Sequence, residues 1–303
     1  MTPLQQQGAL CKAAGRTLAT AGTTRKNEAL SAIAEILSER QDEWLAANAA
    51  DVAAAKEAGM IPSMLDRLTL TPQRVADIVS AVRQVIALPD PVGRVDRMET
   101  RPNGLIIGRR RVPLGVIAII FEARPNVTVD AAVLCLKSGN ACILRGGKEA
   151  IRSNLILATL MRDAIEKTGL PADILFLLED TSRETAARLM KLNQYLDVLI
   201  PRGGAGLIRS VLDNATVPAI QTGLGNCHIY VHESADFDKA LNIIVNAKTQ
   251  RVGVCNAAES LLVDRAVADT FLPAAVAVLH DQGVLIHGDE ATCAACADAG
   301  LAE

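Results

Sequence analysis

The sequence predicts an α/β protein whose centre is a doubly wound parallel sheet. Between residues 115 and 200, short apolar runs rich in β-branched side chains alternate with segments of helical periodicity. This alternation is typical of βαβ units, in which consecutive strands lie parallel. The chain is 50% hydrophobic but only 2% aromatic, which indicates an aliphatic core, and its 303 residues suffice for two domains.

The first 88 residues have the pattern of a helical layer. Apolar side chains recur at helical spacing in residues 25–38, and the same signal returns in 44–56 and 73–88. Thr71 and Pro72 supply a cap and a first turn for the last of these helices, and Pro89 ends it. No side chain in this layer suggests catalytic chemistry.

Residues 92–111 break the helical pattern and predict a protruding β-hairpin. Two extended runs flank Pro102, Asn103 and Gly104, and Asn-Gly is a strong signal for a hairpin turn. The three arginines at 109–111 either bind an anion or keep an exposed strand edge from aggregating. We favour the second interpretation.

The alternating region supplies the predicted sheet. Its strands are expected at 115–121, 141–144, 174–178 and 198–200, and its helices at 125–137, 149–168 and 182–191. Ligands of such sheets bind beyond the carboxyl ends of the strands, so the loops after residues 120, 144 and 200 should carry function. A second, smaller set of elements follows, with strands at 227–231, 259–263 and 284–286 and helices at 236–248 and 266–280.

Charge and composition exclude several classes of partner. A net charge of −3 gives no general attraction to nucleic acid or to an anionic membrane surface. The N-terminus has no signal pattern, and no apolar run is long enough to span a membrane. Seven scattered cysteines indicate thiols in a reducing cytoplasm. The pair Cys293 and Cys296 has no second pair or neighbouring histidines, so we expect no metal site.

The candidate nucleophile is Cys255, which follows the run K-T-Q-R-V-G-V. Only a thiolate is a useful nucleophile, and the cations Lys248 and Arg251 just upstream favour that form. Gly253 leaves room for a substrate carbonyl to approach the sulfur. The alternative is a buried cysteine in an apolar run, which is the commoner situation for an arbitrary cysteine.

The loop after the first buried strand reads F-E-A-R-P-N-V-T. Acyl chemistry needs hydrogen-bond donors aimed at the developing oxyanion, and Asn126 and the backbone N–H of Cys255 are candidates. The alternative makes Asn126 an N-cap or turn residue after Pro125. Glu122 and Arg124 are candidates for holding the ammonium and carboxylate groups of an amino-acid substrate.

The two later loops suggest a phosphate-bearing cofactor. The run L-R-G-G-K-E is not a Walker A loop, and the chain contains no G-x-G-x-x-G. Arg145 and Lys148 place two cations at a strand end, where they would attract the phosphate groups of a ligand. In P-R-G-G-A-G, Gly203 and Gly204 let backbone N–H groups approach a pyrophosphate at a helix N-terminus. A solvated basic turn is the alternative for Lys148.

The run of motifs resembles the aldehyde dehydrogenase superfamily, and within it the γ-glutamyl phosphate reductase family, over essentially the whole chain. The segments that carry the resemblance are E-A-R-P-N-V-T, L-K-S-G-N-A, I-L-R-G-G-K-E, I-P-R-G-G-A-G, C-H-I-Y-V and V-N-A-K-T-Q-R. It implies an NADP(H)-binding domain over 1–225, with 92–111 as an oligomerisation hairpin, and the N-terminal part of a catalytic domain over 226–303. It also implies the oxyanion role for Asn126, a ribose contact for Arg145 and a pyrophosphate segment at Gly203 and Gly204.

The resemblance also implies a reaction. Hydrolytic aldehyde dehydrogenases have a glutamate general base where this chain has Thr222, which argues against an aldehyde-to-acid enzyme. The implied activity is NADPH-dependent reduction of L-glutamyl 5-phosphate to L-glutamate 5-semialdehyde through a Cys255 thioester, in cytoplasmic proline biosynthesis. Lys248 and Arg251 would hold the phosphate. A homo-oligomer and a contact with glutamate 5-kinase are the implied partners.

Two departures from the family keep alternatives open. Val252 stands where the family usually has proline, and the family continues well past residue 303. A truncated, non-catalytic relative that serves as a nucleotide-binding or subunit-interaction module is therefore the second hypothesis. An acyl-CoA-reducing aldehyde dehydrogenase is the third, which the two cations and the short loops disfavour.

Overall fold

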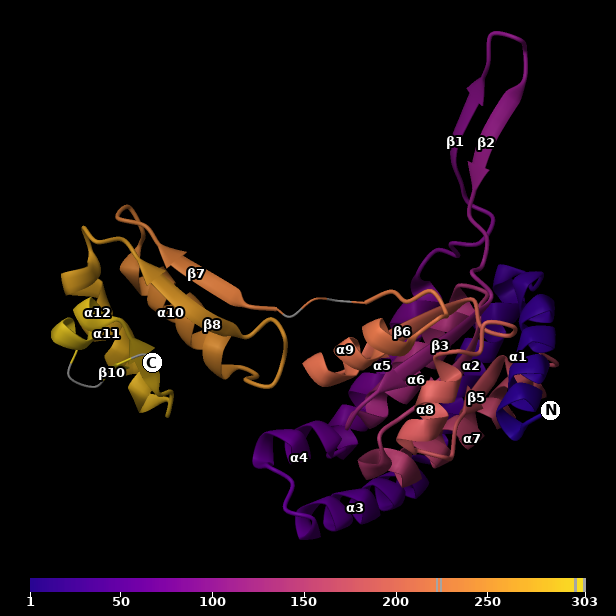
Figure 1. Ribbon diagram of the computed structural model, residues 1–303, viewed down its shortest axis with the longest axis horizontal. Helices are drawn as coiled ribbons and strands as arrows, with labels where there is room; N and C mark the ends of the chain where they lie inside the picture. Colours follow the sequence, from indigo (N-terminus) through magenta and orange to yellow (C-terminus); the bar gives the residue numbers. More distant parts are fainter. Residues whose placement is uncertain (222, 224, 297–298, 302–303) are drawn as a thin grey trace. The chain divides into compact units, whose positions relative to one another are not determined.

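A computed structural model describes residues 1–221, 223, 225–296 and 299–301 of the chain (Figure 1). The chain divides into two compact units, Met1–Thr222 and Gly223–Glu303. The first contains the helical layer, the hairpin and a parallel sheet, and the second contains a smaller α/β arrangement. The α/β class and the doubly wound parallel sheet predicted from the sequence are confirmed.

The helical layer occupies the first 87 residues, all of them described. Its helices are α1 (Pro3–Ala19), α2 (Thr23–Glu39), α3 (Gln41–Glu57), α4 (Pro62–Leu68) and α5 (Pro72–Ala87). Helix α5 begins as the sequence predicts, because the Thr71 side chain caps Arg74 N and Pro72 occupies the first turn. Trp44 on α3 is fully buried in this layer, and its indole N–H donates to Leu37 O at 3.1 Å.

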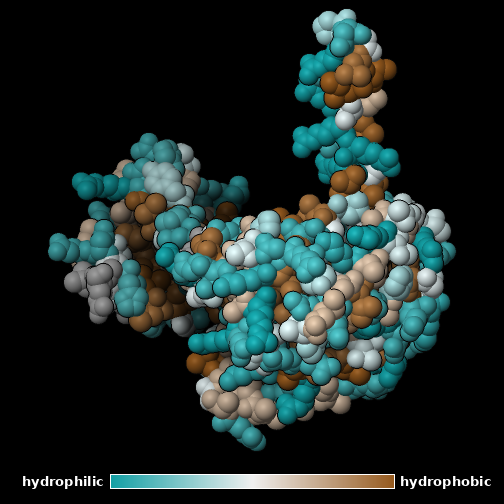
Figure 2. Space-filling view, turned by 45° about the vertical axis from the view of Figure 1, so that its right-hand side comes forward, coloured by the Kyte–Doolittle hydropathy of each residue, from teal (hydrophilic) through white to brown (hydrophobic). Residues whose placement is uncertain are grey.

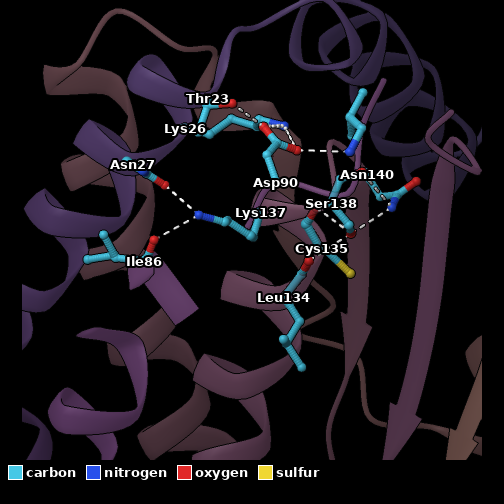
Figure 3. A network of polar contacts seen from close by, with 11 residues as sticks. Thr23, Lys26, Asn27, Ile86, Asp90, Leu134, Cys135, Lys137, Ser138 and Asn140 are labelled. Atoms are coloured by element: carbon cyan, nitrogen blue, oxygen red, sulfur yellow. Dashed lines mark hydrogen bonds and ion pairs between the residues drawn. The ribbon is translucent and has the colours of Figure 1, made fainter. Parts of the chain in front are cut away.

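A buried polar network ties the helical layer to the segment that leads into the hairpin (Figure 3). The carboxylate of Asp90 accepts hydrogen bonds from Lys26 Nζ at 2.8 Å, from Thr23 Oγ1 at 2.8 Å and from Val92 N at 2.9 Å. Lys26 is 1% exposed and also forms a 2.6 Å ion pair with Asp90 Oδ2. Lys137, at the end of α6 (Pro125–Lys137), lies in the same network and donates to a side chain and a carbonyl of the layer.

The hairpin consists of β1 (Val95–Thr100) and β2 (Ile106–Arg110), which pair antiparallel. Gly104 adopts a φ of +83° in the turn, as the Asn-Gly signal predicts. Almost every residue of the two strands is exposed, including large apolar side chains. Those of and beside the hairpin are Val95, Met98, Leu105, Ile106, Ile107 and Val112. Arg111 pairs with Asp96 across the base, which supports the edge-protecting interpretation of the arginines.

In the described part of the first unit, parallel strands form a sheet in the order β5-β4-β3-β6. The strands are β3 (Val116–Phe121), β4 (Ala141–Arg145), β5 (Leu175–Leu177) and β6 (Val198–Arg202). The covering helices are α6 (Pro125–Lys137), α7 (Ile151–Lys167), α8 (Arg183–Leu189) and α9 (Ala205–Asn214), with 3₁₀ turns η1 (Lys148–Ala150) and η2 (Ala172–Ile174). All six residues of β3 are buried, as expected for a central parallel strand.

This strand order places a topological switch point between β3 and β6. From β3 the chain steps to β4 and then β5 on one side, whereas β6 returns to the opposite side of β3. The connections that follow β3 and β6 therefore lead in opposite directions from the carboxyl edge of the sheet. Ligands of open α/β sheets bind at such a point.

The second unit has two pairs of parallel strands in its described residues. Strands β7 (Cys227–Val231) and β8 (Ala258–Val263) are joined by α10 (Phe237–Thr249), and α11 (Ala268–Asp281) follows. Strand β9 (Ile286–Gly288) pairs with β10 (Ala299–Leu301), with α12 (Glu290–Ala295) between them. The predicted strand at 284–286 is wrong in its start, because the chain becomes extended and paired only from Ile286.

A cavity of about 760 Å³ lies in the second unit between the edges of β8 and β9. Its walls are mostly aliphatic side chains of these strands and of α11. Figure 2 shows apolar side chains of this unit gathered in a hollow on the face in view. Within the described residues, no helix is long and apolar enough to cross a membrane, and no cluster of three or more potential metal ligands occurs.

Candidate active site

The switch point brings Glu122 onto the glycine loop after β6. Glu122 Oε2 accepts a hydrogen bond from Gly204 N at 3.0 Å. A Cβ atom at position 203 would lie 2.6 Å from the same oxygen, so the loop and the carboxylate pack together only because Gly203 lacks a side chain. Glu122 therefore holds the glycine loop in the structure. The sequence predicted Glu122 only as a substrate ligand and did not predict this contact.

The end of β4 is bound to the end of β3 by a second carboxylate. Glu149 Oε1 in the η1 turn accepts a hydrogen bond from Ala123 N at 2.5 Å. Ala123 has a φ of +28°, which is unusual for a residue with a side chain. This bond fixes the strained backbone at the point where the chain leaves β3. Sequence reasoning missed Glu149, since no local pattern pairs it with a residue 26 positions earlier.

Arg145 and Lys148 lie where β4 ends, as predicted. Arg145 is half-buried and donates through Nη2 to Thr181 O, while its Nε is buried with no hydrogen-bond partner among the described residues. Burial lowers the pKa of Arg145, although the carboxylates of Glu149, Asp180 and Glu122 act in the opposite direction. Lys148 is exposed.

These features fit a dinucleotide that carries several phosphate charges. Gly204 is the N-cap of α9, and no side chain in the described part of the chain caps this helix, so its first amide N–H groups are available to an anion. Arg145 adds a buried donor without a partner, and Lys148 adds an exposed cation. The donor set is that of an anion site, with Glu122 already taking the Gly204 N–H.

Asn126 lies in the first turn of α6. The N-cap of this helix is Arg124, so the alternative interpretation of Asn126 as the N-cap is wrong. Asn126 Nδ2 donates to Asp130 Oδ2 at 2.9 Å, one helical turn away. An amide nitrogen carries two hydrogens, so one N–H is held by Asp130 and the other has no hydrogen-bond partner among the described residues.

Asp130 is the second residue that sequence reasoning missed, although its i, i+4 spacing from Asn126 is visible in the sequence. Burial raises the pKa of Asp130, and the hydrogen bond from Asn126 and the charge of Arg202 lower it only in part. Arg202 ends β6 and pairs in register with Phe121 of β3. The Asn126 amide is therefore oriented by a carboxylate at the same edge of the sheet.

Cys255 lies in an irregular turn between α10 and β8. The residue is exposed, so the alternative of a buried structural cysteine is wrong. The backbone just before β7 passes against Cys255. A Cβ atom added at Gly225 would lie only 2.6 Å from Cys255 O. Val252, which stands at the family's usual proline position, is 64% exposed. Thr222 lies outside the described residues.

The two cations upstream of Cys255 differ in their surroundings. Lys248, near the end of α10, donates from Nζ to Ala258 O at 3.0 Å, which connects the helix to the start of β8. The ammonium group has three donors, and the other two have no hydrogen-bond partner among the described residues. Arg251 is exposed at the start of the turn. The predicted site residues thus form two groups, one in each unit.

Comparisons with known proteins agree with the motifs. A family model described as the aldehyde dehydrogenase family matches residues 6–292. The chain is similar to a γ-glutamyl phosphate reductase of Moorella thermoacetica, at 57% identity over 289 residues that cover 95% of this chain and 69% of that protein. A γ-glutamyl phosphate reductase of Clostridium perfringens is 55% identical over 296 residues, which are 98% of this chain and 71% of the relative.

The fold is similar to that of solved structures with the same name. The crystal structure of γ-glutamyl phosphate reductase from Thermotoga maritima matches with a TM-score of 0.92 and 46% sequence identity, over 100% of this chain and 73% of that one. The enzyme from Saccharomyces cerevisiae matches with a TM-score of 0.69 and 32% identity, over 97% and 74%. The aldehyde dehydrogenase-like fold predicted in the sequence analysis is confirmed.

Proposed function

We propose that the chain reduces L-glutamyl 5-phosphate to L-glutamate 5-semialdehyde in proline biosynthesis. The chain belongs to the aldehyde dehydrogenase family and, within it, to the γ-glutamyl phosphate reductases. These enzymes are oxidoreductases. NADPH is the proposed reductant. The observation that carries the proposal is the exposed Cys255 thiol in the turn before β8. An exposed thiol with Arg251 on the same turn and Lys248 at the end of the preceding helix is suited to attack an acyl phosphate.

In the proposed reaction, the Cys255 thiolate attacks the acyl carbon and phosphate leaves, which gives a glutamyl thioester. The free N–H of Asn126, oriented by Asp130, and the Cys255 backbone N–H stabilise the tetrahedral oxyanion. Arg251 and the remaining donors of Lys248 hold the departing phosphate. Glu122 and Arg124 are proposed to hold the amino-acid end of the substrate, for which Glu122 would exchange its bond to Gly204 N.

The cofactor is assigned to the first unit. Gly203, Gly204 and the uncapped start of α9 would hold its pyrophosphate, and Arg145 and Lys148 its ribose and 2′-phosphate. When bound, NADPH supplies the hydride that resolves the thioester to the aldehyde. We assign residues 1–225 to cofactor binding and 226–303 to catalysis. The boundary that the structure gives, between residues 222 and 223, lies close to this division.

Assembly and location complete the proposal. The exposed apolar side chains of β1 and β2 suit pairing with a second copy, so we propose a homo-oligomer formed through the hairpin. A contact with glutamate 5-kinase, which would supply the acyl phosphate, stays a prediction. All seven cysteines, each in the described part of the chain, are thiols, which supports a reducing cytoplasm.

The test is reduction of NADP⁺ by glutamate 5-semialdehyde in the presence of phosphate, the reverse reaction. Cys255→Ser should abolish it, and Cys293→Ser, the matched control on α12, should leave it unchanged. The dependence on phosphate distinguishes an acyl-phosphate enzyme from one that uses coenzyme A. A folded chain that binds NADPH without turnover would instead favour the non-catalytic nucleotide-binding module.

A further inference from the structure

Cys227, at the start of β7, lies against the residue that carries the candidate nucleophile. Its Sγ donates to Cys255 O at 3.4 Å. The other cysteines lie elsewhere: Cys11, Cys135 and Cys142 are buried in the core of the first unit, and Cys293 and Cys296 are in and beside α12. Cys227 is half-buried and Cys255 is exposed.

The local backbone favours a close approach of the two side chains. Strands β7 and β8 are adjacent and parallel, and the register between them shifts at Cys227 and His228. This irregularity places Cys227 opposite Ala258, and Ala258 is three residues after Cys255. The Cys227 thiol contacts the turn that carries Cys255. Gly225 passes so close that an added Cβ would be 3.7 Å from Cys255 Cβ. The segment 225–227 and Cys255 are therefore in direct contact.

The turn that carries Cys255 is not part of a helix or strand. The Cys227 thiol lies against the backbone of Cys255 itself, so a bond between the two sulfurs would require rotation of the Cys255 side chain and a change in the turn. Disulfides need Cα atoms within about 7 Å and side chains that point towards each other. Cys255 lies outside any strand ladder, so its backbone can move without breaking strand hydrogen bonds.

We propose that Cys227 is a resolving cysteine that forms a disulfide with Cys255 when a hydroperoxide oxidises the nucleophile. The Cys255 thiolate attacks the O–O bond of hydrogen peroxide, which gives a sulfenic acid and releases hydroxide. The Cys227 sulfur then attacks the sulfenic sulfur, and the S–O bond breaks with loss of water. In total, two thiols and one hydrogen peroxide give one disulfide and two water molecules.

The disulfide would protect an exposed thiol from irreversible damage. A sulfenic acid with no neighbouring thiol is oxidised further to sulfinic acid, which thiol reductants do not reverse. A disulfide in an exposed turn is open to reduction by glutathione or thioredoxin-type thiols. The cross-link itself does not depend on the proposed function, whereas its consequence, reversible loss of activity, rests on Cys255 being the nucleophile.

The test is peptide mapping of the full chain after treatment with hydrogen peroxide. Trypsin releases Cys227 in residues 210–239 and Cys255 in residues 252–265. We expect these two peptides to be joined in the wild-type chain and to separate with dithiothreitol. A mixture of ¹⁵N-labelled and unlabelled chains should give only joined peptides of one isotope. Mixed pairs, or Cys255 joined to another cysteine, would overturn the proposal.

The variant Cys227→Ser provides a second readout. Its Cys255 should accumulate sulfinic acid roughly tenfold faster than the wild type, because no thiol intercepts the sulfenic acid. Cys293→Ser is the matched control and should behave as the wild type. Equal sulfinic acid in Cys227→Ser and wild type would refute the protective role. The wild-type map needs no variant, so it decides the cross-link even if Cys227→Ser folds poorly.

Discussion

Replacing Asp90 by asparagine should destabilise the first unit more than any exposed charge change. Figure 3 shows Asp90 as the anion that pairs with Lys26. Asparagine keeps an oxygen for Val92 N and turns its amide N–H towards Thr23 Oγ1, which can accept it, but the negative charge is removed. The Lys26 ammonium, 1% exposed, is then left buried without a counter-ion, while Lys137 adds a like charge nearby.

The expected loss follows from the burial of the pair. Breaking a buried ion pair by removing one partner costs about 3–5 kcal/mol. Asp90 itself is 11% exposed and asparagine retains two of its bonds, so we expect the lower end, about 3 kcal/mol. The matched control is Asp213→Asn, whose i, i+4 partner Arg209 is 77% exposed, and it should cost below about 1 kcal/mol.

The assay is urea denaturation followed by circular dichroism of the whole chain, in which the transition of the first unit is expected to shift. The double variant Lys26→Met with Asp90→Asn should recover much of the loss, because no unpaired charge remains. If Asp90→Asn lies within 1 kcal/mol of Asp213→Asn on this scale, the network does not stabilise the layer and our reasoning from burial is wrong.

The same pair sets a pH dependence. Burial raises the pKa of Asp90, but the hydrogen bonds from Lys26, Val92 and Thr23 outweigh burial and leave it below its ordinary value. A lowered native pKa means that the stabilisation is fully present above the unfolded value, about pH 4, and is lost as pH falls through the native value. Asp90→Asn should remove this acid limb from a plot of stability against pH.

Four further outcomes are expected. Asn126→Ala should lower kcat by about 10²–10³-fold with little change in KM. In the Asn126→Ala background, Asp130→Asn should cause no further loss of kcat, which double-mutant kinetics would measure. Additive losses would contradict the coupling of the two residues. Gly203→Ala should weaken NADPH binding at least about tenfold by calorimetry, because the new Cβ displaces Glu122 and the loop; an unchanged Kd would exclude the loop from the cofactor site. Lys148→Glu should reverse the preference between NADPH and NADH in steady-state rates, unless this residue is only a solvated cation. Burial raises the pKa of Cys11 to about 12, so a thiol reagent at pH 8 should label Cys11 only after denaturation, as mass spectrometry of the labelled peptides would show.

The fold was predictable where local signals agree with tertiary contacts. The Asn103-Gly104 turn, the Thr71 cap and the β-branched run at 116–121 each specify their element within a few residues. The C-terminal part of the second unit carries weaker signals. Its short strands β9 and β10 and helix α12 lie in an alanine-rich stretch without clear periodicity, so the sequence indicated only a strand that begins two residues early.

The candidate site was predictable as a set of loops but not as a set of bonds. Rules for parallel sheets place Glu122, Arg145 and Gly203 at one edge of the sheet. The partner of Glu122 is 82 residues away, and no periodicity in the sequence relates the two positions. Lys248 was expected to face a ligand, and its ammonium also bonds to Ala258 O, which depends on how α10 packs on β8. Contacts of this kind follow from tertiary packing, which a single sequence does not display.

Trp44 is the chain's single tryptophan, and it is enclosed within the helical layer. Its emission spectrum therefore reports the solvation of the first unit alone, because the second unit has no tryptophan. A red shift of that emission during heating, compared with the loss of ellipticity from the whole chain, would reveal which unit melts first. Trp44 is thus an intrinsic fluorophore of the first unit, and no dye needs to be attached.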